Sequence, residues 1–79
     1  MEQNIIEELT LMLLYLTSWK ERGMEDAYPR SWKGYDFDIL NRLSEKEMVV
    51  DGKRSKSVGI TDDGVAKAKE LLMKYGIEK

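Results

Sequence analysis

The stretch LNRLSEKEMVVDGKRSKSVGITDDGVAKAKELL, residues 40–72, decides the expected fold of this 79-residue chain. It leaves a helical pattern, passes through two short runs rich in β-branched residues, and enters a second helical pattern. The two runs are separated by the turn signal Asp51-Gly52, an arrangement that is typical of a β-hairpin. We therefore predict strands over 48–50 and 57–60, joined by a basic tip at 53–56.

A helix is predicted on each side of this hairpin, over 36–47 and from Thr61 onward. Asp36 and Thr61 have side-chain oxygens that can cap the first N–H groups of the two helices. Gly76 is expected to end the last helix, since glycine readily adopts the left-handed conformation found there. The side chains expected to face the core are Phe37, Ile39, Leu40 and Leu43 in the first helix and Val65, Ala68, Leu71, Leu72 and Tyr75 in the second.

Another helix is predicted at the N-terminal end, over 3–21, because apolar residues recur there at helical spacing without Gly or Pro. Its predicted core stripe consists of Ile5, Leu9, Met12, Leu16 and Trp19, with Ile6 and Leu13 beside it. Leu11, Leu14 and Tyr15 then lie off this stripe. Either the rest of the chain wraps around the helix, or these three residues face a second subunit. We favour the second explanation and predict a homodimer with Leu11, Leu14 and Tyr15 at its interface.

The segment GMEDAYPRSWKG, residues 23–34, is predicted to be an irregular connection, because it contains two glycines and the only proline. Tyr28 and Trp32 are expected to pin it to the molecule. Trp32 either seals the core or anchors a partner, and we favour the core. The expected fold is a single α+β domain over 1–79, winged-helix-like, with three helices and a two-stranded hairpin.

Composition excludes several classes of function. The chain has no Cys and no His, so it lacks thiolate metal ligands, disulfides and the commonest general base. The paired acids near Asp36 and Asp62 are explained by helix capping. The apolar runs are too short to span a membrane, and the acidic start does not resemble a signal peptide. We therefore expect a cytoplasmic protein that is not an enzyme and holds no cofactor or metal.

Residues 40–72 are similar to the second half of winged helix-turn-helix domains of the MarR and PadR type, where a recognition helix, a wing and an L-T-x-x-G turn follow one another. The positions that fit are Leu40, Leu43, Val49, Ile60, Thr61 and Gly64. Glu47 departs from that pattern, which usually has a helix-ending Gly there. The segments WKGYDFDILNRL and KSVGITDDG also resemble a small prokaryotic family known only as a domain of unknown function. That second resemblance covers about residues 9–75 and implies no activity.

The winged-helix resemblance implies binding of duplex DNA, with one helix in the major groove and the wing on the backbone. Carried over, Asn41, Arg42 and Lys46 would read bases, and phosphates would be bound by Lys33, Lys53, Arg54 and Lys56. Only the middle of the chain, 30–57, has more basic than acidic residues, and the net charge is −2. The alternative function is a protein-interaction or dimerisation module on the same scaffold, without nucleic acid, favoured by the apolar first helix and by the aromatic and Met residues.

Overall fold

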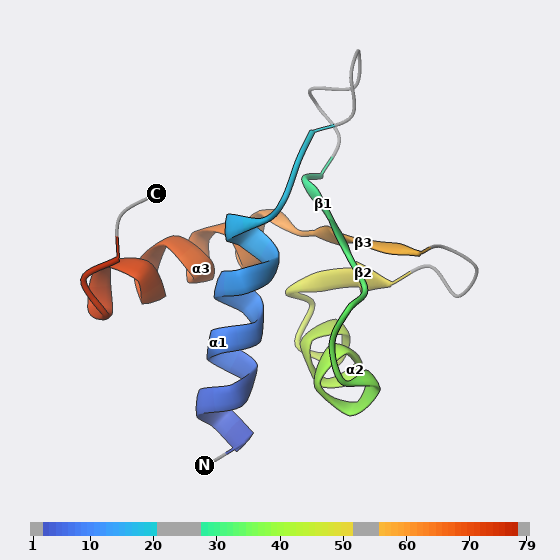
Figure 1. Cartoon of the computed structure of the whole chain (residues 1–79), viewed down its shortest axis with the longest axis horizontal. Helices are drawn as coiled ribbons and strands as arrows, with labels where there is room; N and C mark the ends of the chain where they lie inside the picture. The colour runs from blue at the N-terminus through green and yellow to red at the C-terminus, as the bar shows by residue number, and fades with distance from the viewer. Residues whose placement is uncertain (1–2, 21–27, 52–55, 78–79) are drawn as a thin grey trace.

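The structure is a computed structural model that describes residues 3–20, 28–51 and 56–77. Within these ranges the chain forms three helices and a three-stranded antiparallel sheet (Figure 1). In chain order the elements are α1 (Gln3–Leu16), β1 (Arg30–Trp32), α2 (Phe37–Glu45), β2 (Val49–Asp51), β3 (Ser57–Ile60) and α3 (Asp62–Lys74). The expected α+β class is thus confirmed, and the sheet has one more strand than predicted.

The sheet has the strand order β1-β3-β2, so β3 lies in the middle. Ser31 lies opposite Val58, and Val49 lies opposite Ile60. These four side chains are buried and form the inner face of the sheet, because directly opposed residues share a face. The third strand, β1, comes from the connection that was predicted to be irregular. Three residues after a proline are too short a run for alternation to be recognised in the sequence.

Helix α1 ends at Leu16, five residues before the predicted end. The hydroxyl of Thr17 donates to the Leu13 carbonyl at 2.7 Å, and the hydroxyl of Ser18 donates to the Tyr15 carbonyl at 2.6 Å. Such bonds compete with the helical pattern at a helix end. The backbone of Trp19 then pairs with that of Arg30, at 2.9 and 2.8 Å, so the chain enters the edge of the sheet instead of continuing the helix.

The face of α1 that packs on the core agrees only in part with the predicted one, because Met12 is buried and Ile6 and Leu16 pack against the core as expected, but other members of the stripe are exposed. Leu11 and Leu14 are only 2% and 0% exposed, whereas Ile5, Leu9 and Leu13 are 37%, 41% and 46% exposed. Leu11 and Leu14 are therefore core residues of one chain, and the reason for placing them at a dimer interface is removed. Tyr15 is half-buried against the same core.

The predicted core stripe of α1 was wrong in part because two polar residues share the buried side. The side chain of Glu7 has an ion-pair partner on another helix, and the hydroxyl of Thr10 donates to the Ile6 carbonyl at 2.7 Å. A polar group can be buried when it is hydrogen-bonded or paired. The spacing of apolar residues in the sequence could not show that Glu7 and Thr10 have such partners.

The core lies where α1 meets the other elements. In Figure 1, α1 stands between α3 on one side and the sheet with α2 on the other. The buried apolar residues are Leu11, Met12, Leu14, Ile39, Leu40, Leu43, Val49, Val58, Ile60, Ala68, Leu71 and Leu72. The predicted inward residues of α2 and α3 are thus largely confirmed, with Tyr75 at 44% exposure as an exception in α3.

Two aromatic residues that were expected in the core lie at the surface. Phe37 is 73% exposed and Trp32 is 63% exposed. Phe37 is the first residue of α2, and the inward stripe of that helix is already formed by Ile39, Leu40 and Leu43. Tyr35, two residues before Phe37, is partly buried against the core.

Side-chain caps begin α2 and α3 as predicted. A carboxylate oxygen of Asp36 accepts from the N–H of Asp38 at 2.8 Å, and the hydroxyl of Thr61 accepts from the N–H of Gly64 at 2.9 Å. Gly76, with a φ of 70°, follows the end of α3 as expected. At the end of α2 the equivalent left-handed residue is Glu47, with a φ of 60°.

Candidate functional site

The outward side of α2 carries the two residues that were predicted to read DNA bases. Asn41 is exposed and Arg42 is half-buried. Asp38 and Glu45 are exposed on the same side of the helix, together with the ring of Phe37. Two carboxylates therefore flank one guanidinium, which is unfavourable for a surface that has to approach phosphates.

Two of the predicted DNA-binding lysines form ion pairs within the molecule. The ammonium of Lys33, just after β1, contacts the carboxylate of Asp51 at the end of β2. Because β3 lies between those two strands, this pair spans the sheet. The ammonium of Lys46, which follows α2, lies 2.9 Å from the Glu7 carboxylate on α1. Both lysines thus have a structural role that the sequence did not indicate.

The basic hairpin tip is only partly described. Lys53 and Arg54 lie outside the described residues, and Lys56 is exposed just before β3. Beside β2 runs an open groove, about 600 Å³ in volume, whose lining includes four acidic residues. These are Glu47, Asp51, Asp62 and Asp63. The surroundings of the hairpin base are therefore acidic on this side.

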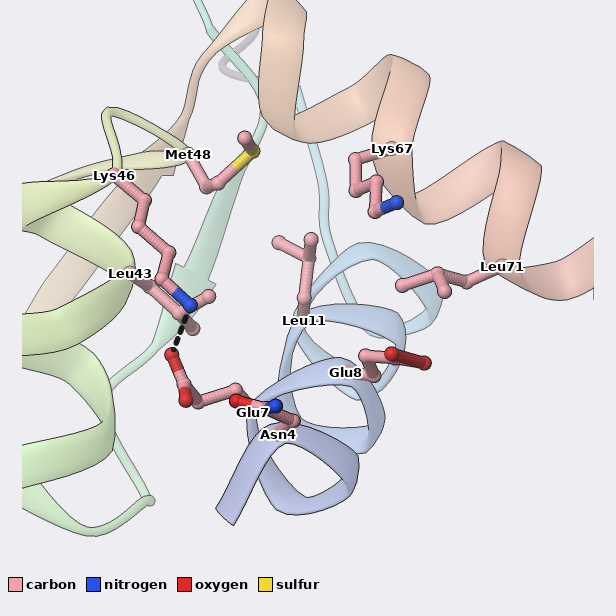
Figure 2. A pocket seen from close by; sticks show the side chains of 9 residues that line it. All are labelled: Asn4, Glu7, Glu8, Leu11, Leu43, Lys46, Met48, Lys67 and Leu71. Carbon is pink, nitrogen blue, oxygen red and sulfur yellow. Dashed lines mark hydrogen bonds and ion pairs between the residues drawn. The ribbon is translucent and has the colours of Figure 1, made fainter.

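A second hollow, referred to here as the helix pocket, lies between α1, α2 and α3 (Figure 2). Its volume is about 280 Å³. The apolar part of its lining comes from Leu11, Leu43, Met48 and Leu71, and the polar part from Asn4, Glu7, Glu8, Lys46 and Lys67. This pocket was not predicted from the sequence, because its lysines have the pattern of ordinary solvent-exposed helix residues. The one feature of the sequence that could have indicated the pocket is Glu7, an acidic residue one turn before the buried Leu11 and on the same side of the helix.

The outer face of the sheet carries a pair of tryptophans. The ring centroids of Trp19 and Trp32 are 4.9 Å apart, and the ring planes are tilted by 42°. Beside them the guanidinium of Arg30 lies along β3, where its Nε donates to the hydroxyl of Ser57 at 2.9 Å. Trp32 therefore packs on another aromatic residue at the surface and does not seal the core.

The T-x-x-G turn joins the end of α2 to the start of α3. The hydroxyl of Thr61 donates to the Glu47 carbonyl at 2.6 Å, and the N–H of Thr61 donates to the Met48 carbonyl at 3.0 Å. A Cβ atom on Gly64 would overlap that same Met48 carbonyl. This position thus requires glycine for close packing, which explains the motif without a ligand.

Within residues 3–20, 28–51 and 56–77, no three or more acidic, His or Cys side chains are grouped so that they could hold a metal ion. None of the described helices is long and apolar enough to cross a membrane. The described part of the chain thus offers exposed surfaces, the open groove beside β2 and the helix pocket for binding.

A family model described as "Domain of unknown function (DUF6429)" matches residues 2–78. The chain belongs to the DUF6429 family. It is 33% identical over 72 residues to "Uncharacterized protein y4hR" of Sinorhizobium fredii (strain NBRC 101917 / NGR234). That alignment covers 90% of this chain and 88% of the relative. No solved structure matches the chain. The predicted membership in a family of unknown function is confirmed, whereas no winged-helix family is identified.

Proposed function

We propose that this chain is a non-catalytic protein-interaction module that forms a homodimer through the outer face of α1. The observation that carries the proposal is the exposure of Ile5, Leu9 and Leu13, here called the α1 stripe. The three residues lie one turn apart on the same side of the helix. Large apolar side chains that are exposed side by side mark interaction sites on small proteins.

A second copy of the chain is the partner that this stripe fits best. A two-fold dimer brings the same patch of both subunits together, so the patch has to be complementary to itself. An uncharged apolar stripe meets this condition, because pairing it with itself places no like charges together. The stripe spans about 12 Å along the helix, so the interface is small and we expect reversible, micromolar association.

The dimer is tested by measuring the mass of the chain in solution. We expect light scattering at high micromolar concentration to give about twice the 9.2 kDa mass of one chain. Leu9→Glu should reduce this to the monomer mass, because it places two carboxylates at the interface. Met73→Glu is the matched control, since Met73 is exposed on the side of α3 that faces away from the core. A monomeric wild type, or a dimeric Leu9→Glu variant, contradicts the proposal.

Duplex DNA binding is a second candidate function, and one observation favours it. Helix α2 leads directly into the β2–β3 hairpin, and the strand order is β1-β3-β2. A helix followed by a hairpin wing is the order of elements that the winged-helix resemblance implies. Asn41 and Arg42 have the side-chain chemistry that suits purine edges. The acidic neighbours of these residues make this the weaker candidate.

A gel-shift experiment with duplex DNA at low salt separates the two functions. If DNA is bound, Arg42→Ala and the triple Lys53/Arg54/Lys56→Ala variant should each weaken the shift. Lys69→Ala is the control, because Lys69 is exposed on α3, away from the hairpin. Absence of a shift with the wild type removes the DNA candidate and leaves the dimer proposal intact.

A further inference from the structure

The helix pocket has an apolar floor and a charged rim, and each charged side chain of the rim forms an ion pair within the protein. Leu11 and Leu71 are almost completely buried beneath it, and Met48 closes one side. In Figure 2 the side chain of Lys67 extends from α3 above Leu11, whereas that of Lys46 runs down on the other side of Leu11 to the Glu7 carboxylate. A ligand in this pocket would therefore touch aliphatic carbon together with the side chain of Lys67.

The two acids of the pocket already have partners in the structure. Glu7 lies 2.9 Å from Lys46, and its side chain is only 7% exposed. Glu8 accepts a hydrogen bond from the Tyr75 hydroxyl at 3.1 Å. It also lies 3.9 Å from the ammonium of Lys74. Both carboxylates therefore have partners within the protein, and neither needs a cationic group of a ligand as its partner.

Lys67 differs from Lys46 in that its partner is held only weakly. Its ammonium lies 3.6 Å from the carboxylate of Glu70 on the same helix, and both side chains are well exposed. An exposed pair of this kind contributes little to stability and can be exchanged for another partner. The charge that Lys67 brings to the pocket is thus available to an anion.

We propose that the helix pocket binds a small organic monocarboxylate with an apolar body, whose carboxylate group pairs with Lys67 and whose body rests on Leu11, Leu43 and Leu71. A cavity of roughly 150 Å³ is sufficient for benzene. The pocket, at about 280 Å³, therefore has room for a body of similar size together with a carboxylate.

The experiment uses hexanoate as the probe and the full chain labelled at its Leu and Met methyl groups. We expect hexanoate to shift the methyl resonances of Leu11, Leu43, Met48 and Leu71 in a saturable manner, with an affinity on the order of 1 mM for so small a molecule. Hexylamine and 1-hexanol have the same carbon chain without the negative charge, and they should bind far more weakly.

Lys67→Gln should weaken hexanoate binding about tenfold, since it removes one charged hydrogen bond. Lys69→Gln is the matched control, with the same chemical change on an exposed position of the same helix, and it should bind like the wild type. Equal binding of hexanoate by Lys67→Gln and wild type overturns the proposal, as does equal binding of hexanol, or the absence of saturable shifts up to the solubility limit.

Ligand binding can be tested independently of the dimer. The pocket uses Asn4, Glu7, Glu8 and Leu11 of α1, whereas the α1 stripe lies on a different side of that helix. The Leu9→Glu variant should therefore retain hexanoate binding even when it is monomeric.

Discussion

Two single residues, Glu47 and Gly64, determine how α2, the hairpin and α3 are joined. Glu47 adopts a φ of 60° at the end of α2, a conformation that costs a residue with a Cβ atom about 1–2 kcal/mol. It is kept in place by the N–H of Met48, which donates to the Leu43 carbonyl at 2.9 Å. Gly64 lies directly against the Met48 carbonyl. Both residues thus act on the same turn, one through its backbone angle and the other through its lack of a side chain.

Glu47→Gly should stabilise the protein by about 0.5–1 kcal/mol, because glycine adopts positive φ without strain. The midpoint of thermal unfolding should rise by about 4 °C. The matched control is Glu45→Gly, the same chemical change inside the last turn of α2, which should destabilise by about 1 kcal/mol. If both variants are destabilised alike, the positive φ of Glu47 does not lower the stability of the wild type.

Gly64→Ala should destabilise by about 1–3 kcal/mol, because its methyl group forces α3 away from the Met48 carbonyl. The control is Gly34→Ala, where an added Cβ atom has no neighbour within 4 Å, and urea unfolding should show no loss of stability. A Gly64→Ala variant as stable as the wild type would show that the turn can open at no cost.

At the scale of elements, α1 and α2 are connected by the Glu7–Lys46 pair above their shared apolar contact. Lys46→Met keeps an unbranched side chain, shorter by the ammonium nitrogen, but leaves the buried Glu7 carboxylate without its cation. We expect a loss of about 1–2 kcal/mol in urea unfolding, discounted because Lys46 is itself half-exposed.

The double variant Glu7→Gln/Lys46→Met should recover part of this loss, since it removes the unpaired charge. Lys69→Met on α3 is the control and should leave stability unchanged within about 0.5 kcal/mol. An equal, small effect of both Lys→Met changes would indicate that the pair contributes nothing to joining the helices.

The elements differ in how far they could be predicted. Helices α2 and α3 and the strands of the hairpin followed from local signals, namely a capping oxygen, an apolar stripe and a turn dipeptide. The core face of α1 was predicted only in part, because the buried side includes Glu7, whose ion-pair partner lies 39 positions away in the sequence. Strand β1 depends likewise on pairing with β3, which no local pattern encodes.

The candidate site was predictable to a smaller extent than the fold. Asn41 and Arg42 lie on the outward side of α2 as expected, but the charges of Lys33 and Lys46 are used inside the molecule. The helix pocket combines residues from three helices, so it exists only in the folded chain. Composition showed that the chain has many lysines, but their partners depend on tertiary contacts.

For the whole molecule, α1 is the element on which both proposals depend. It stands between α3 and the other elements, so its inward side supplies the core and the floor of the helix pocket. Its outer side presents the α1 stripe, with Leu9 in the middle. In a two-fold dimer the middle of such a stripe lies near the axis, so Leu9 of one subunit faces Leu9 of the other.

Site-directed crosslinking tests this arrangement most directly, because the chain has no cysteine of its own. Under mild oxidation, Leu9→Cys should form a covalent dimer rapidly, since its thiol meets the same thiol across the axis. Met73→Cys, which is more exposed but lies outside the stripe, should remain monomeric for much longer. Crosslinking of the two variants at the same rate, or none at position 9, would contradict a homodimer formed through the outer face of α1.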